Sequence, residues 1–386
     1  MITRKLNKET DFNQFAEVSA SAYIHPASET TFCDENDIFG TFIDDGKTLI
    51  SQIESTYRNR WYGNIILPCA MVGGVASKPE YRRMGGVRET FNLVFQDAIE
   101  KGALISILFP FSTSYYRKFG YDVIANYYEA DCAFSVFKSI ERYPDLTLLK
   151  ESNKDEFFEA YTEICLKYNL MLERKDFYGF SLTPYENSQF TYFINDAASK
   201  GYVTFTLNRP QRVVDVAEIS YTDKNALLKL LGFLRVYDGN FDTVHFKKLP
   251  TDSVIPYVLD YDNRVFKRAM FTDGAGRVLN VKKFLEAIPY PAEDGKFTIK
   301  IIDKQIEMNN AVFTVTYKNQ KGVVEVANGD DYCLALDIAQ FSRIVLGREG
   351  LSPEAVAYLP DVETNGNPAD LLKAFPRATV QFFDDF

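Results

Sequence analysis

The sequence predicts an α/β fold over its first two regions, followed by a smaller α+β domain. Strand-like apolar runs alternate with segments of helical spacing over 1–140, and 141–285 repeats this layout faintly. In 286–386 short strands come first and helices follow, which is typical of α+β domains. A chain of 386 residues has the length of two or three domains. We therefore expect three, over 1–140, 141–285 and 286–386.

The first region contains the most clearly marked elements. Phe12, Phe15 and Val18 recur at helical spacing, and 65–75 is almost continuously apolar, as in a buried strand. Gly120 follows a short helical segment and is expected to be its left-handed cap. The predicted elements are a helix over 11–23, a hairpin over 41–53 turning at 44–46, a turn at 62–64, the strand 65–75, a helix over 86–101, a strand over 103–109, a helix over 112–119 and a strand ending at 133.

The second region lacks one feature of the first. Its strand-to-helix junction at 221–225 has neither glycine nor arginine, so we expect a degenerate copy without an anion site. The predicted elements of the second region are a helix over 153–168, a hairpin over 189–207, a strand over 213–221 and a helix over 226–234. In the third region we expect short strands within 297–326, an amphipathic helix over 334–346 and a last helix over 370–374.

Composition argues against several classes of function. A net charge of −10 disfavours non-specific nucleic-acid binding. No apolar run approaches ~20 residues, and the N-terminal residues lack the apolar core of a signal peptide. The five cysteines are scattered without a Cys-x-x-Cys, and the two histidines lie far apart, so we expect neither a metal site nor a disulfide framework. These observations predict a soluble cytoplasmic protein without nucleic-acid or membrane partners.

The most informative motif follows the strand 65–75. The run RRMGGVR at 82–88 opens the predicted helix 86–101, and glycines at a helix start let an anion approach the backbone N–H groups. Arg82, Arg83 and Arg88 add the charge that a pyrophosphate requires. A glycine-rich turn with arginines is equally compatible with a surface turn. No Gly-Lys-Ser/Thr and no G-x-G-x-x-G is present, which excludes a Walker loop and a dinucleotide fingerprint.

Other residues of the chain favour one interpretation of this motif. Arg82-x-x-Gly85-x-Val87 resembles the acetyl-CoA loop of the GNAT superfamily of N-acetyltransferases, Gln/Arg-x-x-Gly-x-Gly/Ala, from which Val87 departs. The whole chain is similar to the Eis type, which joins a GNAT domain, a degenerate GNAT-like domain and a sterol-carrier-protein-like domain. The features that support this resemblance are Val75-Ala76-Ser77, the loop 83–88, the run YRKFGY at 116–121 and the aromatic C-terminus. The family's Tyr-x-Arg-Phe-Gly-Tyr is matched here with Arg117-Lys118 in a different order.

The resemblance implies that acetyl-CoA is a co-substrate and that no metal is required. In the family the strand end splays from its neighbour and offers backbone groups to the pantetheine arm, while the loop binds the pyrophosphate. The residues that the resemblance assigns to the cofactor are Val75, Ala76, Ser77, Arg83, Met84, Gly85, Gly86, Val87, Arg88, Tyr116 and Arg117.

Acetyl transfer to an amine requires two proton movements, because the ammonium must lose a proton and the departing thiolate must gain one. The resemblance assigns Tyr121 as the acid and the α-carboxylate of Phe386 as the base. A free terminus has a pKa of ~3.5 and is a poor base unless it is desolvated. Phe382, Phe383 and Phe386 would supply an apolar setting, although a plain surface tail is the alternative.

The predicted function is therefore acetyl-CoA-dependent N-acetylation of small cationic molecules such as aminoglycosides or polyamines. The alternative is a non-catalytic protein that senses CoA or binds an apolar ligand. Asp34, Glu35 and Asp37 could form an acidic lip for a cationic acceptor, although a solvated loop is the simpler interpretation. The resemblance also implies a homo-oligomer, specifically a hexamer.

Overall fold

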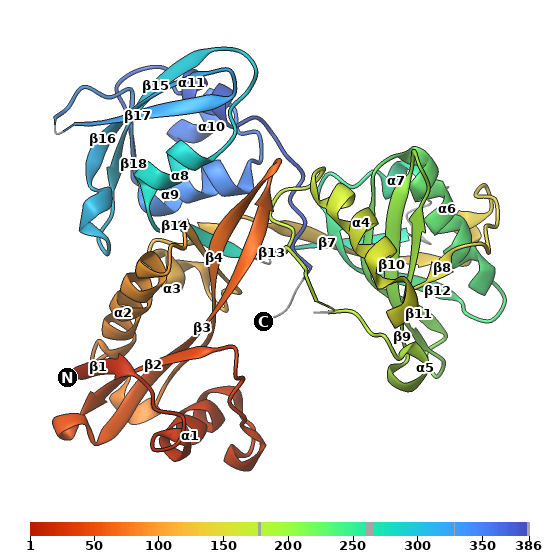
Figure 1. Cartoon of the computed structure of the whole chain (residues 1–386), viewed down its shortest axis with the longest axis horizontal. Helices are drawn as coiled ribbons and strands as arrows, with labels where there is room; N and C mark the ends of the chain where they lie inside the picture. Colours follow the sequence, from red (N-terminus) through yellow and green to blue (C-terminus); the bar gives the residue numbers. More distant parts are fainter. Residues whose placement is uncertain (177–178, 260–265, 273, 328, 384–386) are drawn as a thin grey trace.

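The computed structural model describes residues 1–176, 179–259, 266–272, 274–327 and 329–383. Within these ranges the strands form three sheets, and each sheet is the centre of one lobe (Figure 1). The dark-blue C-terminal segment leaves the third lobe and runs between the other two. Among the described residues, no helix has both the length and the apolar character needed to cross a bilayer.

The first sheet is dominated by the long hairpin of β3 and β4. Its strand order is β1-β2-β3-β4-β5-β14-β6. The strands are β1 (Ile2–Lys5), β2 (Asp37–Ile43), β3 (Thr48–Tyr62), β4 (Ile65–Ser77), β5 (Ile105–Leu108), β6 (Asp122–Val123) and β14 (Ala275–Val278), and the helices are α1 (Phe12–Tyr23), α2 (Gly86–Glu100) and α3 (Thr113–Arg117). Helix α2 packs on one face through Phe91, Val94 and Phe95, and α1 packs on the other through Phe15 and Val18.

The second sheet has the order β13-β7-β12-β11-β10-β9-β8 among the described strands. The strands are β7 (Asn126–Ala133), β8 (Thr147–Leu148), β9 (Gln189–Asn195), β10 (Lys200–Asn208), β11 (Val213–Tyr221), β12 (Thr243–Pro250) and β13 (Phe266–Thr272), and the helices are α4 (Lys154–Cys165), α5 (Pro184–Asn187), α6 (Lys224–Leu234) and α7 (Ile255–Val258). Helices α4 and α6 bury apolar faces against this sheet through two separate cores.

The third sheet has the order β17-β16-β15-β18-β19 among the described strands. The strands are β15 (Gly295–Ile302), β16 (Ala311–Lys318), β17 (Lys321–Ala327), β18 (Leu334–Asp337) and β19 (Val362–Thr364), and the helices are α8 (Val281–Ala287), α9 (Ile338–Ser342), α10 (Pro353–Ala357) and α11 (Ala369–Ala374). One apolar core joins this lobe to the first, because Met71 and Ile107 pack with Phe313 and Val345 in a single cluster.

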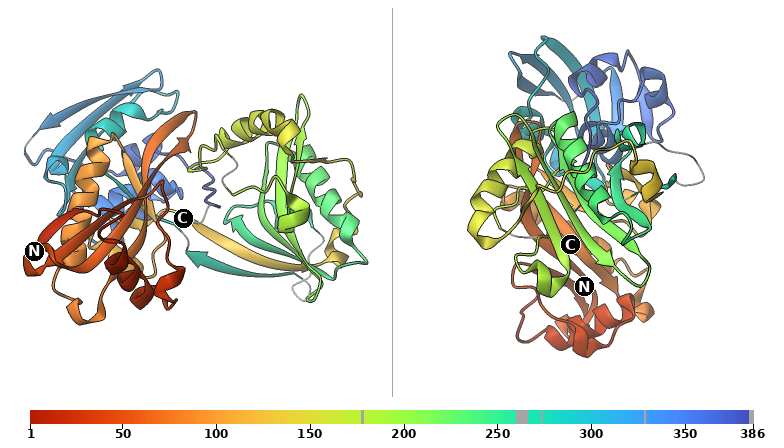
Figure 2. Two further views of the ribbon diagram at one scale, coloured as in Figure 1. Left: turned by 60° about the horizontal axis from the view of Figure 1, so that its bottom comes forward. Right: turned by 90° about the vertical axis from the view of Figure 1, so that its right-hand side faces the viewer.

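The sheets of the first two lobes exchange strands. Strand β7 leaves the first lobe and pairs with β12 and β13 in the second sheet. Strand β14 returns from the second lobe and pairs antiparallel with β5 and β6 in the first sheet. Figure 2 shows β7 and β13 side by side and antiparallel where the chain passes between the first and second lobes.

Most of the predicted elements are confirmed, and one is wrong. The helices expected over 11–23, 86–101 and 226–234 correspond to α1, α2 and α6. The expected helix over 334–346 instead begins as strand β18, which pairs in parallel with β15 from Ile299 and Leu334 onward. The Asp337 side chain accepts a hydrogen bond from the Gln340 N–H, and this cap starts α9 only at Ile338. An apolar run of this length fits a buried strand and a buried helix equally well.

Candidate active site

Strands β4 and β5 part at the point where β4 bends. They pair in parallel from Cys69–Ile105 to Val72–Leu108, and no later pair joins them among the described residues. On its other side β4 pairs with β3, and the register shifts between Gln52–Ala76 and Glu54–Gly73, which places one extra β4 residue in a bulge. Gly74 in this bulge has φ +55. The expected separation of Val75, Ala76 and Ser77 from the neighbouring strand is therefore present.

The first turn of α2 opens onto free space. Gly85 is the N-cap with φ +91, and no heavy atom lies within 4 Å of the position that its Cβ would take. In the part of the chain that the structure describes, the N–H groups of Gly85, Gly86 and Val87 have no acceptor. The side chains that precede and follow these glycines, Arg82, Arg83, Met84, Arg88 and Glu89, are exposed. The positive end of a 15-residue helix is thus available to an anion.

Gly86 also has a packing role, which the sequence did not indicate. Its carbonyl accepts hydrogen bonds from Thr41 Oγ1 and Thr90 Oγ1, each at 3.0 Å. A Cβ on Gly86 would lie 2.7 Å from Ser51 Oγ and 3.0 Å from Ile50 Cδ1. Position 86 therefore requires a glycine because α2 approaches β3 closely there. The position of a Gly85 side chain, in contrast, faces open space.

Tyr121 lies inside the core between β5 and α2. Its side chain is 0% exposed and its hydroxyl is 2.7 Å from Ser106 Oγ. Because the Ser106 hydroxyl donates to the Ala70 carbonyl at 2.9 Å, it accepts the proton of Tyr121. Burial raises the pKa of Tyr121 well above its ordinary value, so the phenol keeps its proton at neutral pH. Ala70 and Ser106 form a pair two residues before the strands part.

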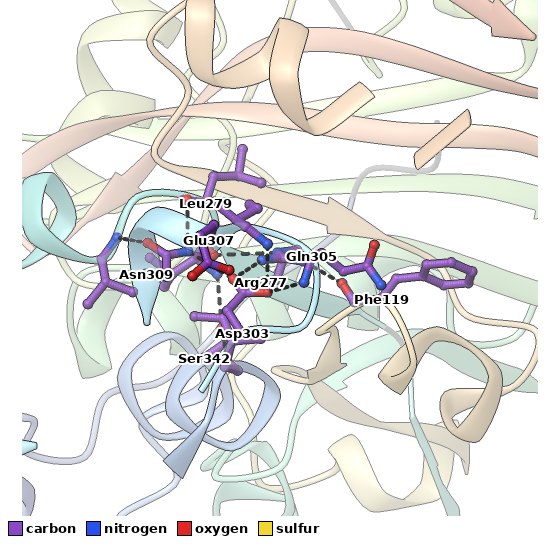
Figure 3. A network of polar contacts seen from close by, with 12 residues as sticks. Phe119, Arg277, Leu279, Asp303, Gln305, Glu307, Asn309 and Ser342 are labelled. Carbon is purple, nitrogen blue, oxygen red and sulfur yellow. Dashed lines mark hydrogen bonds and ion pairs between the residues drawn. The ribbon is translucent and has the colours of Figure 1, made fainter. Parts of the chain in front are cut away.

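A buried ion pair from β14 fixes the turn before Tyr121 (Figure 3). Arg277 Nη1 donates to the Phe119 carbonyl at 2.6 Å, and Nη2 contacts Asp303 Oδ2 at 2.5 Å. Both charged side chains are 0% exposed. Gly120 has φ +79, as expected of a left-handed cap, and a Cβ there would lie 2.9 Å from Arg277 Nη1. Arg277 was not identified from the sequence, because its partners are distant along the chain.

The two cofactor residues expected on α3 point elsewhere. Arg117 Nη2 contacts both oxygens of the buried Asp122 at 2.9 Å, so its charge is already neutralised. Tyr116 is 4% exposed and lies edge-on to Phe91 and Tyr121 in the α2 core. Among the residues assigned to the cofactor, the end of β4 and the loop 83–88 are therefore brought together. The Tyr116 side chain belongs to the core, and the Arg117 side chain, which is 32% exposed, pairs with Asp122.

The C-terminal tail reaches the first lobe. Asn169 N–H donates to the Thr379 carbonyl at 2.7 Å, and Gln381 N–H donates to the Asn169 carbonyl at 3.1 Å. Phe382 and Phe383 are 5% and 9% exposed, and the Phe382 ring lies 5.1 Å from the ring of Phe109, directly after β5. The expected base, Phe386, lies outside the described residues.

The expected acidic lip consists of carboxylates that already have partners. Asp34 contacts Lys8, Glu35 contacts Arg58, and Asp37 contacts Lys5 and Lys101. A different carboxylate, Glu54, was not identified from the sequence. It lies beside the β4 bulge and accepts a hydrogen bond from Asn36 Nδ2 at 2.7 Å. The signal that could have indicated this site is the pair Gly73-Gly74 within an apolar strand, which suggests a bulge or a close approach.

The equivalent helix of the second lobe is closed to anions. The Asp223 carboxylate caps α6 and accepts from the N–H groups of Asn225 and Ala226. Burial alone would raise the pKa of Asp223, but hydrogen bonds from Thr222, Ser199 and these N–H groups hold it below its ordinary value. A carboxylate therefore already occupies the position where a phosphate would bind.

The comparisons with known proteins agree with this layout. Residues 3–124 and 171–278 each match a family described as acetyltransferase (GNAT) domain, and residues 281–382 match a sterol carrier protein domain. No match was found among curated proteins.

Solved structures resemble the whole chain. A probable N-acyltransferase from Enterococcus faecalis V583 aligns at 20% identity with a TM-score of 0.82, covering 100% of this chain and 99% of the other. A GCN5-related N-acetyltransferase from Anabaena variabilis aligns at 19% identity and a TM-score of 0.78, covering 100% and 98%. Eis1 from Mycobacterium abscessus aligns at 17% identity and a TM-score of 0.78, covering 100% of both chains. The chain is therefore an acetyltransferase built of two GNAT domains and a sterol carrier protein domain, and it shares the fold of the Eis type.

Proposed function

We propose that this enzyme transfers the acetyl group of acetyl-CoA to amino groups of small cationic molecules, such as polyamines or aminoglycosides. The observation that supports this proposal most directly is the open first turn of α2 beside the parting of β4 and β5. Unpartnered N–H groups at a helix N-terminus suit a pyrophosphate. Among the described residues, β4 does not pair with β5 beyond Val72 and Leu108, so the facing edge of β4 offers backbone groups to an extended pantetheine arm. When bound, acetyl-CoA supplies the activated thioester.

Two groups of this chain would move the protons. Tyr121 holds a proton in a dry core, and it would donate that proton to the departing sulfur. This role requires the sulfur to enter the parting of the strands beside Ser106. The α-carboxylate of Phe386 would take the proton of the acceptor ammonium. Since Phe382 contacts Phe109 at the end of β5, the remaining residues can span at most ~14 Å toward the same parting.

The test is release of free thiol from acetyl-CoA with a panel of amines. We expect turnover with polyamines or aminoglycosides, and a loss on the order of 10²-fold in kcat for Tyr121→Phe, with acetyl-CoA binding retained. Near-wild-type kcat in this variant would show that another group protonates the thiolate. Binding of acetyl-CoA without thiol release on any amine would favour the non-catalytic sensor instead. A homo-oligomer, specifically a hexamer, remains a proposal from the resemblance, and a cytoplasmic location remains a proposal from the composition.

A further inference from the structure

Glu54 differs from several other carboxylates of the first lobe in that it has no cationic partner among the described residues. Asp37, Glu35 and Glu17 each contact a lysine or an arginine. Among the described residues, no lysine, arginine or histidine forms an ion pair with Glu54. A half-buried anion that lacks a counter-charge is costly to fold, so its presence needs an explanation.

The surroundings of Glu54 hold its carboxylate over the bulge. A Cβ on Gly74 would lie 2.3 Å from Glu54 Oε1, so the absence of a side chain at Gly74 leaves the room that the carboxylate occupies. Asn36 Nδ2 donates to Oε2 at 2.7 Å. The Thr56 hydroxyl donates to Asn36 Oδ1, which turns the amide N–H₂ of Asn36 toward Glu54. Oε1 has no hydrogen-bond donor among the described residues.

The position of Glu54 relates it to the site of transfer. Glu54 pairs with Gly73, one residue past the last pair of β4 with β5. Neighbouring strands lie about 4.8 Å apart, so Glu54 borders the parting. Side chains alternate along β3, which places Glu54 on the same face as Arg60. The Arg60 guanidinium lies 4.5 Å from the centre of the Phe382 ring, so the C-terminal tail packs against the same face of the sheet.

The opposite face of the sheet contains the proposed acid. Tyr57, three residues after Glu54, points to α2 and donates a hydrogen bond to Asp97 Oδ2 at 2.5 Å. Tyr121 lies in the same α2 core. A thioester in the parting would therefore have Tyr121 on one side and Glu54 on the other, where the acceptor must arrive.

We propose that Glu54 is the carboxylate that binds the ammonium group of the acceptor. This inference rests on the proposed N-acetylation and identifies where the cationic substrate is recognised. An ammonium group would donate to Oε1 and supply the missing counter-charge, as in other charge-assisted hydrogen bonds. Tyr23 at the end of α1 borders the site, because its hydroxyl donates to the Val75 carbonyl at 3.4 Å. Burial of this hydroxyl, together with the charge of Glu54, raises the pKa of Tyr23.

The pKa of Glu54 allows a stability measurement to distinguish a carboxylate that binds substrate from one that only stabilises the fold. Burial raises this pKa, against the opposing hydrogen bond from Asn36. The folded protein therefore binds a proton at Glu54 more readily than the unfolded chain, and the contribution of Glu54 to stability declines as the pH rises through its folded pKa. At pH values where this carboxylate is ionised, Glu54→Gln removes a half-buried charge and keeps an acceptor for Asn36. We expect its unfolding temperature to equal or exceed that of the wild type.

The experiment compares Glu54→Gln with Glu35→Gln in the full chain, using spermidine as the probe. Glu35→Gln is a matched control, because it removes the same charge from the segment before β2, where the carboxylate already contacts Arg58. We expect the KM for spermidine to rise on the order of 10- to 100-fold in Glu54→Gln only, with the KM for acetyl-CoA unchanged. In the wild type, that KM should also rise as the pH falls through the pKa of Glu54.

Calorimetry of spermidine binding in the presence of CoA separates this inference from the proposed function. An unchanged spermidine KM and affinity in Glu54→Gln would overturn the role of Glu54 while leaving N-acetylation intact. The wild type could bind spermidine and release no thiol. If Glu54→Gln then abolished this binding, the result would support the role of Glu54 and contradict the proposed function. Absence of spermidine binding to the wild type would overturn the role of Glu54. A lower unfolding temperature in Glu54→Gln would show that the carboxylate is structural.

Discussion

At the scale of single residues, Arg277 shows how one buried charge can set the geometry of a distant turn. It connects the Phe119 carbonyl to Asp303, and its guanidinium lies 4.4 Å from the centre of the Phe95 ring. Asp303 in turn accepts from the N–H groups of Gln305 and Ile306 (Figure 3). The third lobe thereby holds the loop that presents Tyr121. We infer that Arg277 is a positioning residue.

Removing one partner of the Arg277–Asp303 ion pair should lower the free energy of unfolding strongly. Asp303→Asn leaves the Arg277 charge buried without compensation, and we expect a loss of about 3–5 kcal/mol in the free energy of unfolding. Replacing both residues with apolar ones, as in Arg277→Met with Asp303→Leu, should restore much of that loss. Urea denaturation measures both effects. The exposed pair of Lys300 and Asp330 is the control, because Asp330→Asn should cost no more than about 1 kcal/mol. A similar small cost for Asp303→Asn would contradict the argument.

At the scale of elements, the start of α2 predicts different consequences for two adjacent glycines. Gly86→Val would force α2 away from Ser51 and Ile50, so it should lower stability first. Gly85→Asn keeps a residue type that tolerates positive φ and adds a side chain to the open space. We expect the fold to remain while CoA affinity, measured by calorimetry, falls on the order of 10-fold. The control is Gly102→Asn after the other end of α2, where φ is +83 and no heavy atom lies within 4 Å. Equal CoA affinity in Gly85→Asn and Gly102→Asn would argue against an anion site.

The elements also show which parts of the fold the sequence could predict. Helix α2 and strand β4 were predictable, because their apolar spacing is local and their ends have glycine and proline signals. Strand β14 was not, since AGRV is short and is stabilised by pairing with β5, far away in the sequence. The loop 83–88 was identified for the same local reason as α2. Glu54 and Arg277 were missed because their partners, Asn36 and Asp303, are brought near only by the folded chain.

At the scale of the whole molecule, the exchange of β7 and β14 and the shared core make the three lobes interdependent. The domain limits near residues 140 and 285 stay a prediction. The tail extends this interdependence to the proposed chemistry. It begins in the third lobe, contacts the second through Ser220, whose hydroxyl lies 2.6 Å from Gln381 Oε1, and reaches the first at Phe109. A group delivered by such a tail depends on the position of every lobe.

The tail predicts that the chain end itself is needed for turnover. An extension beyond Phe386 converts the terminal carboxylate into a neutral amide and moves the new charge away. Deletion of Phe386 leaves a carboxylate one residue short. Both changes should abolish turnover, while CoA binding and the unfolding temperature stay nearly unchanged, because Phe382 and Phe383 remain buried. A tag of equal length on the N-terminus should have no effect, because β1 lies at the edge of the first sheet.

The measurement is kcat for the two tagged proteins, with the tail verified by mass spectrometry. Full activity in the C-terminally extended protein would show that the base is a different group. Glu54 would then be the first candidate, since it borders the same parting of the strands.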